Sequence, residues 1–241
     1  MPQFCSTEDM ASKLFPSFHD SDLVRSIVRQ KIVILGDAAV GKTAIRKVLS
    51  NEPFPEAYRM TPDVEFSVHN VKNISEKVNV EQYIFEIPGN SSLFHQGGDY
   101  FESCFQYVDI ICLVYNVCQN DTFRGLVKWL KYAKGFCTSA STKIFVIANQ
   151  TDRRRSNGES LSKCDSFRTD DNGIMEVHVE SNSNDVSDFC EEHSLELFEC
   201  SAYLNADHCS VKTIFEDLAS RSISYQSSST GERNENESTQ S

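Results

Sequence analysis

The chain has 241 residues and a net charge of −12, and 39% of its residues are hydrophobic. This length allows one domain with a full core and extra segments, and the composition is that of an ordinary globular protein. The sequence contains no apolar run of about 18 residues, so no membrane span is expected. The acidic charge argues against nucleic acid or an anionic membrane as a partner.

The nine cysteines are scattered, without a C-x₂-C pair or a Cys/His cluster that would indicate a metal site. The first residues, MPQFCSTEDM, lack the basic and apolar regions of a secretory signal. Cys112 and Cys200 lie in apolar, strand-like runs, where a free thiol packs as a small hydrophobic group. We therefore expect reduced thiols and a cytoplasmic location.

Residues 1–29 are predicted to be an N-terminal extension. Ser21 or Asp22 could cap a short helix, and four apolar residues would share one face of it: Leu23, Val24, Ile27 and Val28. This pattern predicts a short amphipathic helix before the main domain.

Between residues 30 and 225, strand-like and helix-like segments alternate. The predicted strands are 31–35, 64–71, 78–87, 109–117, 143–149 and 195–200, with a hairpin turn that starts at 73–75. Helices are expected after the first strand up to Ser50, from Asn120 or Asp121 through Tyr132, and over 211–218. The fold class is therefore α/β, with a mostly parallel sheet that carries one antiparallel hairpin strand early in the chain.

Two segments interrupt this alternation. Residues 153–185 are rich in Ser, Asn and Asp and poor in large apolar side chains, which predicts a long polar insertion. Residues 226–241 have the composition of a disordered tail.

The strongest chemical signal follows the first strand. Residues 36–43, GDAAVGKT, match the phosphate-binding pattern G-x-x-x-x-G-K-[ST] at a strand-to-helix junction. Backbone N–H groups and a helix N-terminus attract a phosphate there, the lysine adds a full charge, and the threonine hydroxyl can bind Mg²⁺. The predicted phosphate-binding residues are Asp37, Ala38, Ala39, Val40, Gly41, Lys42 and Thr43.

Two later strands end in motifs that suit a guanine base. Asn149-Gln150-Thr151-Asp152 follows one strand, and Cys200-Ser201-Ala202 follows the next. A carboxylate at Asp152 can accept the paired N–H donors of guanine, which adenine lacks, and the N–H of Ala202 would suit guanine O6. Asn149, Gln150, Asp152, Ser201 and Ala202 are therefore predicted to bind the base.

With the turn at 86–89, these loops resemble the ordered guanine-nucleotide motifs of Ras-superfamily small GTPases, over roughly residues 30–222. The stretch TPDVEF at 61–66 resembles the switch I segment of Rab proteins. The stretches at 80–89, 109–117 and 194–202 resemble the Rab-like GTPase subunits of the intraflagellar-transport B complex. The resemblance implies a P-loop domain with six strands and about five helices that binds GTP or GDP with Mg²⁺.

The same resemblance implies site roles, with several departures. Thr43, Thr61 and Glu86 would hold the metal, although the family usually has Asp where Glu86 stands. Gly89 would sense the γ-phosphate, and Asn90 replaces the Gln that positions the attacking water. Pro88 stiffens this turn. Gln150 and Tyr203 each replace a usual Lys. These departures predict slow or negligible GTP hydrolysis.

The resemblance also implies a setting. The expected partners are a small β-sandwich subunit of intraflagellar transport, as a heterodimer, and other B-complex subunits, in the cilium or flagellum and at the basal body. The sequence ends in ESTQS without a cysteine to prenylate, so no lipid anchor is expected. Two alternatives stay open: an unprenylated atypical Rab switch that needs an activating protein, and a nucleotide-free scaffold in which the motifs have drifted.

Overall fold

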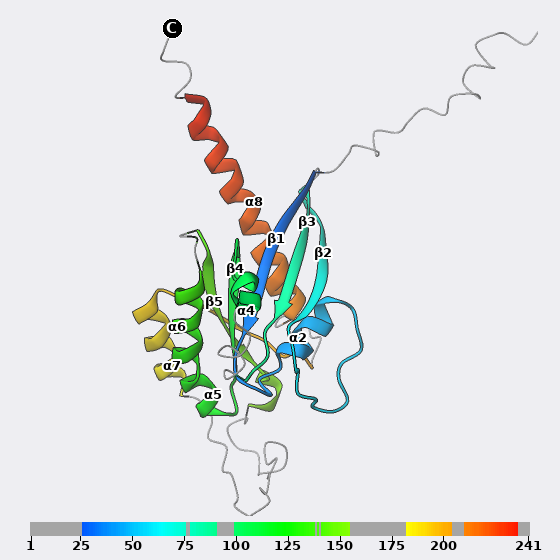
Figure 1. The fold of residues 1–241 in the computed structure, drawn as a ribbon, viewed down its shortest axis with the longest axis vertical. Helices are drawn as coiled ribbons and strands as arrows, with labels where there is room; N and C mark the ends of the chain where they lie inside the picture. The colour runs from blue at the N-terminus through cyan, green and yellow to red at the C-terminus, as the bar shows by residue number, and fades with distance from the viewer. Residues whose placement is uncertain are drawn as a thin grey trace, which may run out of the picture.

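The computed structural model describes residues 26–75, 78–90, 99–137, 139, 141–154, 182–203 and 210–235. They form a six-stranded sheet in the order β2-β3-β1-β4-β5-β6, flanked by helices (Figure 1). Only the β2–β3 pair is antiparallel. The predicted α/β class and the early hairpin strand are confirmed.

The strands lie close to their predicted positions. They are β1 (Ser26–Leu35), β2 (Glu65–Ser75), β3 (Val78–Glu86), β4 (Ile110–Asn116), β5 (Lys143–Asn149) and β6 (Glu196–Glu199). The helices are α2 (Lys42–Leu49), α4 (Asp99–Cys104), α5 (Asn120–Arg124), α6 (Leu126–Phe136), α7 (Ser183–His193) and α8 (Val211–Glu235), with a 3₁₀ turn, η2, at Thr151–Arg153.

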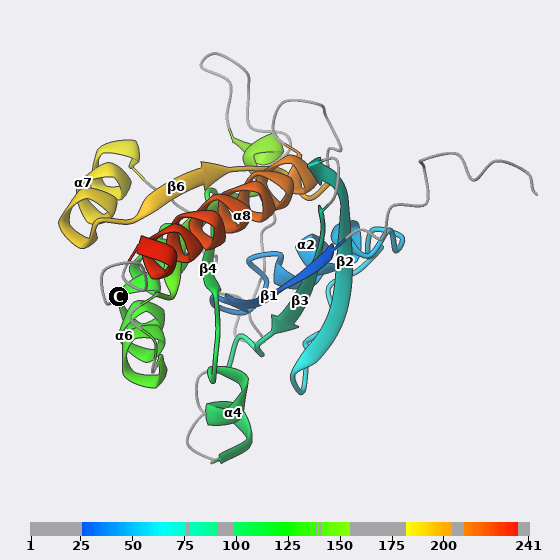
Figure 2. The same cartoon turned by 90° about the horizontal axis from the view of Figure 1, so that it is seen from above.

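Both faces of the central strands are buried, which explains their continuous apolar sequences. Ile32 and Ile34 of β1 pack with α2 and α8 on one face. Val33 and Leu35 pack on the other face, in a cluster that includes Trp129 of α6. Figure 2 shows α8 lying across one side of the sheet, with α4 and α6 on the opposite side. This arrangement fixes the carboxyl ends of β1, β3, β4 and β5 relative to one another.

The predicted N-terminal helix is wrong where the structure describes it. Residues 26–29 belong to β1, and they pair in parallel with the start of β3 from Ser26↔Val78 to Arg29↔Glu81. Val28 packs against the small cluster of Val71, Val80 and Ala219. Strand pairing and this contact favour the extended backbone over a helical face. Residues 21–25 lie outside the described residues.

Three other boundaries differ from the sequence expectation. β2 continues through Ser75, so the hairpin turn falls after the predicted 73–75. The helix expected from Asn120 is two helices that meet at Gly125, and its N-cap residue is Gln119. A Cβ at Gly125 would lie 2.1 Å from Oδ2 of Asp37, so a larger residue at this joint would have to displace the Asp37 side chain.

The polar insertion and the C-terminal tail are both shorter than predicted. α7 begins at Ser183, inside the expected 153–185 insertion, and the Asn182 side chain caps it by accepting from the backbone N–H of Asn184. α8 runs to Glu235, so residues 226–235 are helical where a disordered tail was expected. Residues 155–181 and 236–241 lie outside the described residues.

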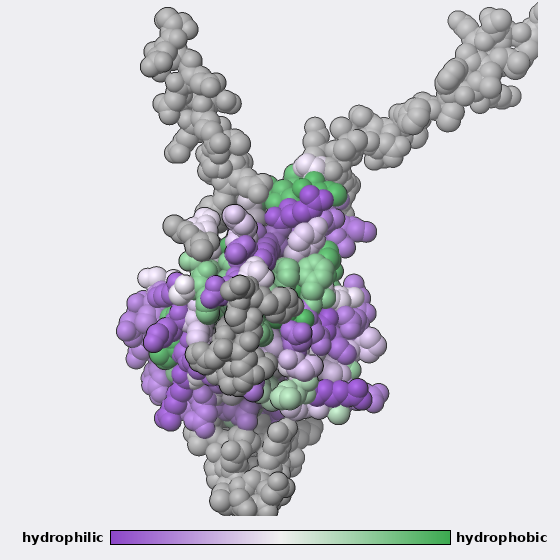
Figure 3. Space-filling model, in the orientation of Figure 1, coloured by the Kyte–Doolittle hydropathy of each residue, from purple (hydrophilic) through white to green (hydrophobic). Residues whose placement is uncertain are grey.

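The positions of the cysteines and of the apolar side chains can be compared with the sequence expectations. Cys112 and Cys200 are free thiols buried in the core, and burial raises the pKa of Cys112. Within the described ranges, no helix is both long and apolar enough to cross a membrane. Polar side chains predominate on the face shown in Figure 3, but apolar side chains reach this surface over the strands β1 to β3. Ile27 of β1 and Phe66 and Val68 of β2 are exposed.

Candidate nucleotide-binding site

A cleft opens at the carboxyl ends of the strands, where α/β sheets bind their ligands. It is lined by the phosphate loop, the segment between α2 and β2, Gly89 and Asn90, and the loops after β5 and β6. Most predicted site residues line this cleft: Ala38, Ala39, Gly41, Lys42, Thr43, Thr61, Glu86, Gly89, Asn90, Asn149, Gln150, Asp152 and Ala202. Asp37, Val40 and Ser201 are predicted site residues that do not line it.

The phosphate loop curls around the Lys42 ammonium group. Nζ of Lys42 donates to the carbonyl oxygens of Gly36 and Asp37, each at 2.8 Å, and the residue is only 5% exposed. Burial lowers the pKa of Lys42 to about 8, against the opposing charges of Glu86 and Asp37. The loop reaches this shape through left-handed residues at Gly41 (φ 98°) and Ala39 (φ 61°).

The side chain of Asp37 contacts α6. Its Oδ1 accepts hydrogen bonds from Nε1 of Trp129 at 2.8 Å and from Nζ of Lys128 at 3.0 Å. The side chain therefore anchors the phosphate loop to α6, and Val40 is fully buried in the core below the loop. Both residues support the loop from outside the cleft.

Gly89 packs directly on the phosphate loop. A Cβ built on it would lie 2.4 Å from the backbone N of Ala38 and 2.7 Å from the carbonyl carbon of Asp37. Any side chain here would have to displace the loop backbone. Pro88 is buried and Asn90 is exposed at the edge of the cleft.

The loops after β5 and β6, together with Phe54, form what we call the base side of the cleft. Asn149 is buried and joins three loops: its Nδ2 donates to the Val40 carbonyl at 2.9 Å, and its Oδ1 accepts from the Ala202 N–H at 3.1 Å. Gln150 has left-handed backbone (φ 66°), and its Nε2 donates to the Ala39 carbonyl at 3.1 Å. The amide thus braces the phosphate loop.

Asp152 lies at the mouth of the base side. Its Oδ1 accepts from the Ser201 hydroxyl at 2.5 Å, and that hydroxyl in turn accepts from the Tyr203 N–H at 3.2 Å. Ser201 therefore orients the carboxylate from behind the cleft wall. The rings of Phe54 and Tyr203 meet edge to face, with centroids 5.2 Å apart, and both line the cleft. Sequence reasoning missed Phe54, which lies in a segment without a motif.

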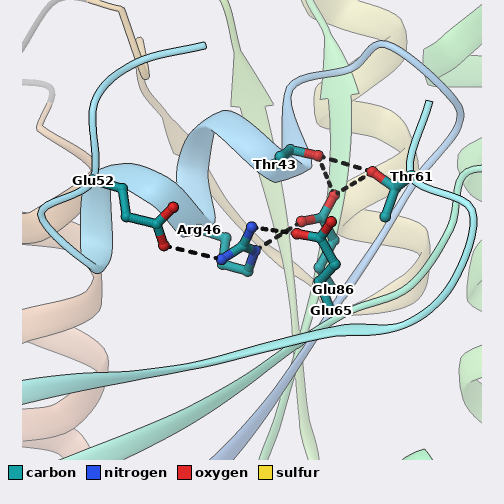
Figure 4. A network of polar contacts seen from close by, with 6 residues as sticks. All are labelled: Thr43, Arg46, Glu52, Thr61, Glu65 and Glu86. Atoms are coloured by element: carbon teal, nitrogen blue, oxygen red, sulfur yellow. Dashed lines mark hydrogen bonds and ion pairs between the residues drawn. The ribbon is translucent and has the colours of Figure 1, made fainter. Parts of the chain in front are cut away.

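A second wall of the cleft, which we call the metal side, consists of Thr43, Arg46, Thr61 and Glu86 (Figure 4). The hydroxyl oxygens of Thr43 and Thr61 lie 3.1 Å apart. Both hydroxyls donate to Oε1 of Glu86, from Thr61 at 3.3 Å. Two hydroxyls and one carboxylate oxygen that converge in this way are hard oxygen donors of the kind that suit Mg²⁺. The three predicted metal residues are thus side by side and fit this ion.

Arg46 is the site residue that the sequence reasoning did not single out. Its Nε donates to Oε2 of Glu86 at 3.1 Å, one terminal nitrogen lies 3.3 Å from Oε1 of Glu52, and the other contacts Glu65 (Figure 4). Burial lowers the pKa of Arg46, but its hydrogen bond to Glu86 and the charges of the three carboxylates outweigh this effect and raise the pKa overall. Arg46 lies four residues after Lys42 and so shares its helix face, but this spacing does not reveal the contact with Glu86, which is 40 residues away along the chain.

The sequence matches the family model of the Ras family over residues 31–224. The chain belongs to the Ras family. It is 27% identical over 158 residues to the Ras-related protein Rab-28 of Caenorhabditis elegans, and 28% identical over 124 residues to the human intraflagellar transport protein 27 homolog. These matches cover 65% and 51% of this chain, and 61% and 64% of the two relatives. Ras-related protein Rab-5B of Plasmodium falciparum is 26% identical over 191 residues, which cover 79% of this chain and 76% of that protein.

Proposed function

We propose that this chain is a guanine-nucleotide-binding, Rab-like subunit of the intraflagellar-transport B complex, with slow or negligible GTP hydrolysis. Membership of the Ras family supports the nucleotide class. The observation that carries the proposal is the convergence of the phosphate loop, the 149–152 loop and the 200–202 loop on one cleft, joined by Asn149. Relatives named as intraflagellar transport protein 27 homologs, from human, mouse and cattle, support the choice of complex.

Each wall has a separate task in this proposal. Lys42 and the phosphate-loop N–H groups bind the phosphates. Asp152, oriented by Ser201, accepts the guanine N–H donors, whereas the Ala202 N–H, which the sequence predicted for guanine O6, donates to Asn149. Thr43, Thr61 and Glu86 hold Mg²⁺, which when bound neutralises charge on the phosphates. Oriented donors of this kind give affinity and base selectivity without requiring hydrolysis.

Slow hydrolysis is proposed on two grounds. Asn90 is one methylene shorter than the Gln that positions water in the family, and its side chain starts from an exposed position beside the buried Pro88. Gly89, at the same turn, is fixed against the phosphate loop. A turn held in this way brings no long amide over the cleft.

The partners and the location follow from the same proposal. The chain would pair with the small β-sandwich subunit of the complex and act in the cytoplasm and at the cilium or flagellum and basal body. Co-expression of the two chains tests this, with stable co-elution as the expected result. Separate elution at micromolar concentration would contradict the assignment to this complex.

The nucleotide function is tested on the purified full chain. GDP or GTP is expected to be released on denaturation. Guanine nucleotide at about 100 times its Kd should raise the Tm by roughly 5–10 °C, while ATP should not. Single-turnover phosphate release should be slow even with Mg²⁺ present. A rate typical of an active switch would favour the Rab alternative, and no bound nucleotide with no Tm shift would favour a scaffold.

A further inference from the structure

Three carboxylates contact the single positive charge of Arg46. Its guanidinium contacts Glu86, Glu52 and Glu65, and its side chain is 8% exposed. Glu86 is 1% exposed, whereas Glu52 and Glu65 are 42% and 40% exposed. Water can therefore solvate two of the carboxylates, but Glu86 depends on protein groups or on a bound cation.

The Arg46 contacts join the same parts of the fold as the predicted metal residues. Thr43, Thr61 and Glu86 connect the start of α2, the segment between α2 and β2, and the end of β3. Arg46 connects α2 to Glu86 at the end of β3, and to Glu52 and Glu65 at the two ends of that same segment. The two bridges run in parallel and share one carboxylate: Oε1 of Glu86 faces the threonines and Oε2 faces Arg46 (Figure 4).

We propose that Arg46 is a positioning residue that acts as a built-in cation on the metal side, holding Glu86 and the 52–65 segment in place so that nucleotide retention depends less on Mg²⁺. This inference rests on the proposed function, because it concerns a bound guanine nucleotide. It goes beyond that function by naming the residue that sets the metal requirement.

The physical reason is competition for one carboxylate. A cation bound to the Thr43 and Thr61 oxygens would share Glu86 with the guanidinium, and two positive groups beside each other repel. Without Arg46, the Glu86 carboxylate would interact only with the metal and the threonines. The contacts through the metal would then be the ones that hold the 52–65 segment in place. Since coupling between two ligands is reciprocal, each cation reduces what the other contributes.

The experiment measures the release of fluorescent N-methylanthraniloyl-GDP from the loaded full chain, in excess unlabelled GDP, with Mg²⁺ or with excess EDTA. The readout is the release rate in EDTA divided by the release rate in Mg²⁺. For Arg46→Gln, this ratio is expected to exceed the wild-type ratio by about 10-fold, within the 5- to 150-fold range of typical coupling. Arg46→Lys keeps the charge but loses the three separate nitrogen contacts, so its ratio should lie between those of wild type and Arg46→Gln.

Arg221→Gln is the matched control, because Arg221 forms ion pairs with Glu196 and Asp217 at the surface, away from the cleft. It should leave the ratio unchanged. A ratio in Arg46→Gln that equals or falls below the wild-type ratio would overturn the inference while leaving nucleotide binding intact. Wild-type protein that binds no guanine nucleotide would overturn the proposed function, and this inference with it.

A second variant covers the case in which Arg46→Gln does not load with nucleotide. Glu65→Gln removes one half-exposed carboxylate and leaves the buried Arg46–Glu86 pair intact. The 52–65 segment then loses one of its two ties to Arg46. The ratio should rise about 5-fold, at the low end of coupling effects. A wild-type ratio in this variant would count against the inference.

Discussion

The two walls of the cleft are built from different interactions. The base side is joined by neutral hydrogen bonds between loops, from Asn149 to Val40 and Ala202 and from Gln150 to Ala39. The metal side is joined by charge, with Arg46 between carboxylates. Both walls carry residues that depart from the family pattern. On the base side Gln150 braces the phosphate loop, whereas on the metal side Glu86 pairs with the buried Arg46.

The largest expected effect is on the metal side. Glu86→Gln removes the buried one of the three carboxylates that contact Arg46, and breaking a buried ion pair by removing one partner costs about 3–5 kcal/mol. We therefore expect the free energy of unfolding to fall by about 3 kcal/mol, as measured by chemical denaturation. Glu52→Gln is the matched control, since its half-exposed carboxylate also contacts Arg46, and it should cost less than about 1 kcal/mol. Equal losses in both variants would show that burial does not distinguish the two contacts.

On the base side, Asp152→Asn should relax the choice of base. The amide presents a donor to guanine N–H groups that need acceptors, and hydrogen bonds to a charged group contribute about 1.5–3 kcal/mol each. The ratio of GTP to ATP affinity is expected to fall about 100-fold, as measured by calorimetry. Glu199→Gln makes the same charge change at a carboxylate that pairs with Arg154, and it should not alter the ratio. An unchanged ratio in Asp152→Asn would remove Asp152 from the base site.

Lys42 should make both nucleotide affinity and folding stability depend on pH. Its pKa of about 8 means that the free protein loses this proton above that pH. Bound phosphates favour the charged amine, so above pH 8 binding takes up a proton and nucleotide affinity falls by up to about tenfold per pH unit. Without nucleotide the sign is opposite: folding stability rises from about pH 8 towards 10.5, because the buried amine no longer has to carry its charge.

Affinity measurements between pH 7 and 9.5 test this expectation. The Lys42→Arg variant serves as the control, because its side chain keeps the charge throughout that range. Its affinity should be lower overall but should not show the Lys42 slope. A wild-type affinity that stays flat above pH 8 would mean that the amine keeps its proton in the free protein.

A smaller effect is expected at Gln150. Gln150→Ala removes a neutral hydrogen bond to the phosphate loop, which contributes about 1 kcal/mol, so nucleotide affinity should fall about 5-fold. Gln150→Lys restores the residue that the family resemblance implies and should change affinity by less than about 2-fold, because the loop is already braced. A large gain from the lysine would show that the amide is a poor replacement.

The smallest effect is expected at Asn90. Asn90→Gln lengthens the amide but leaves Pro88 and Glu86 in place, so single-turnover GTP hydrolysis should rise by about threefold or less. A well-placed proton-transfer group contributes roughly 10²- to 10⁴-fold. Recovery of that size from the single change would show that Asn90 alone limits hydrolysis.

The sequence predicted the parts of this fold that local pattern determines. Covered strands such as 143–149 could be read from continuous apolar residues, and the phosphate loop from its motif between a strand and a helix. The features that the sequence did not predict depend on contacts between residues far apart along the chain. Residues 26–29 follow a helical pattern, yet they pair with β3 some 50 residues away along the chain. Arg46 looks like a surface residue until folding brings Glu86 beside it, 40 residues on.

The close approach of Gly89 to the phosphate loop has a consequence for reading sequences of this kind. Because a Cβ at this position would meet the backbone of Ala38 and Asp37, glycine is required for the fold as well as for any contact with a γ-phosphate. Selection for stability alone would remove nearly every substitution here. In a library sorted only for folded protein, position 89 should therefore be as depleted of variants as in one sorted for GTP binding, whereas position 152 should tolerate change in the first library and not in the second.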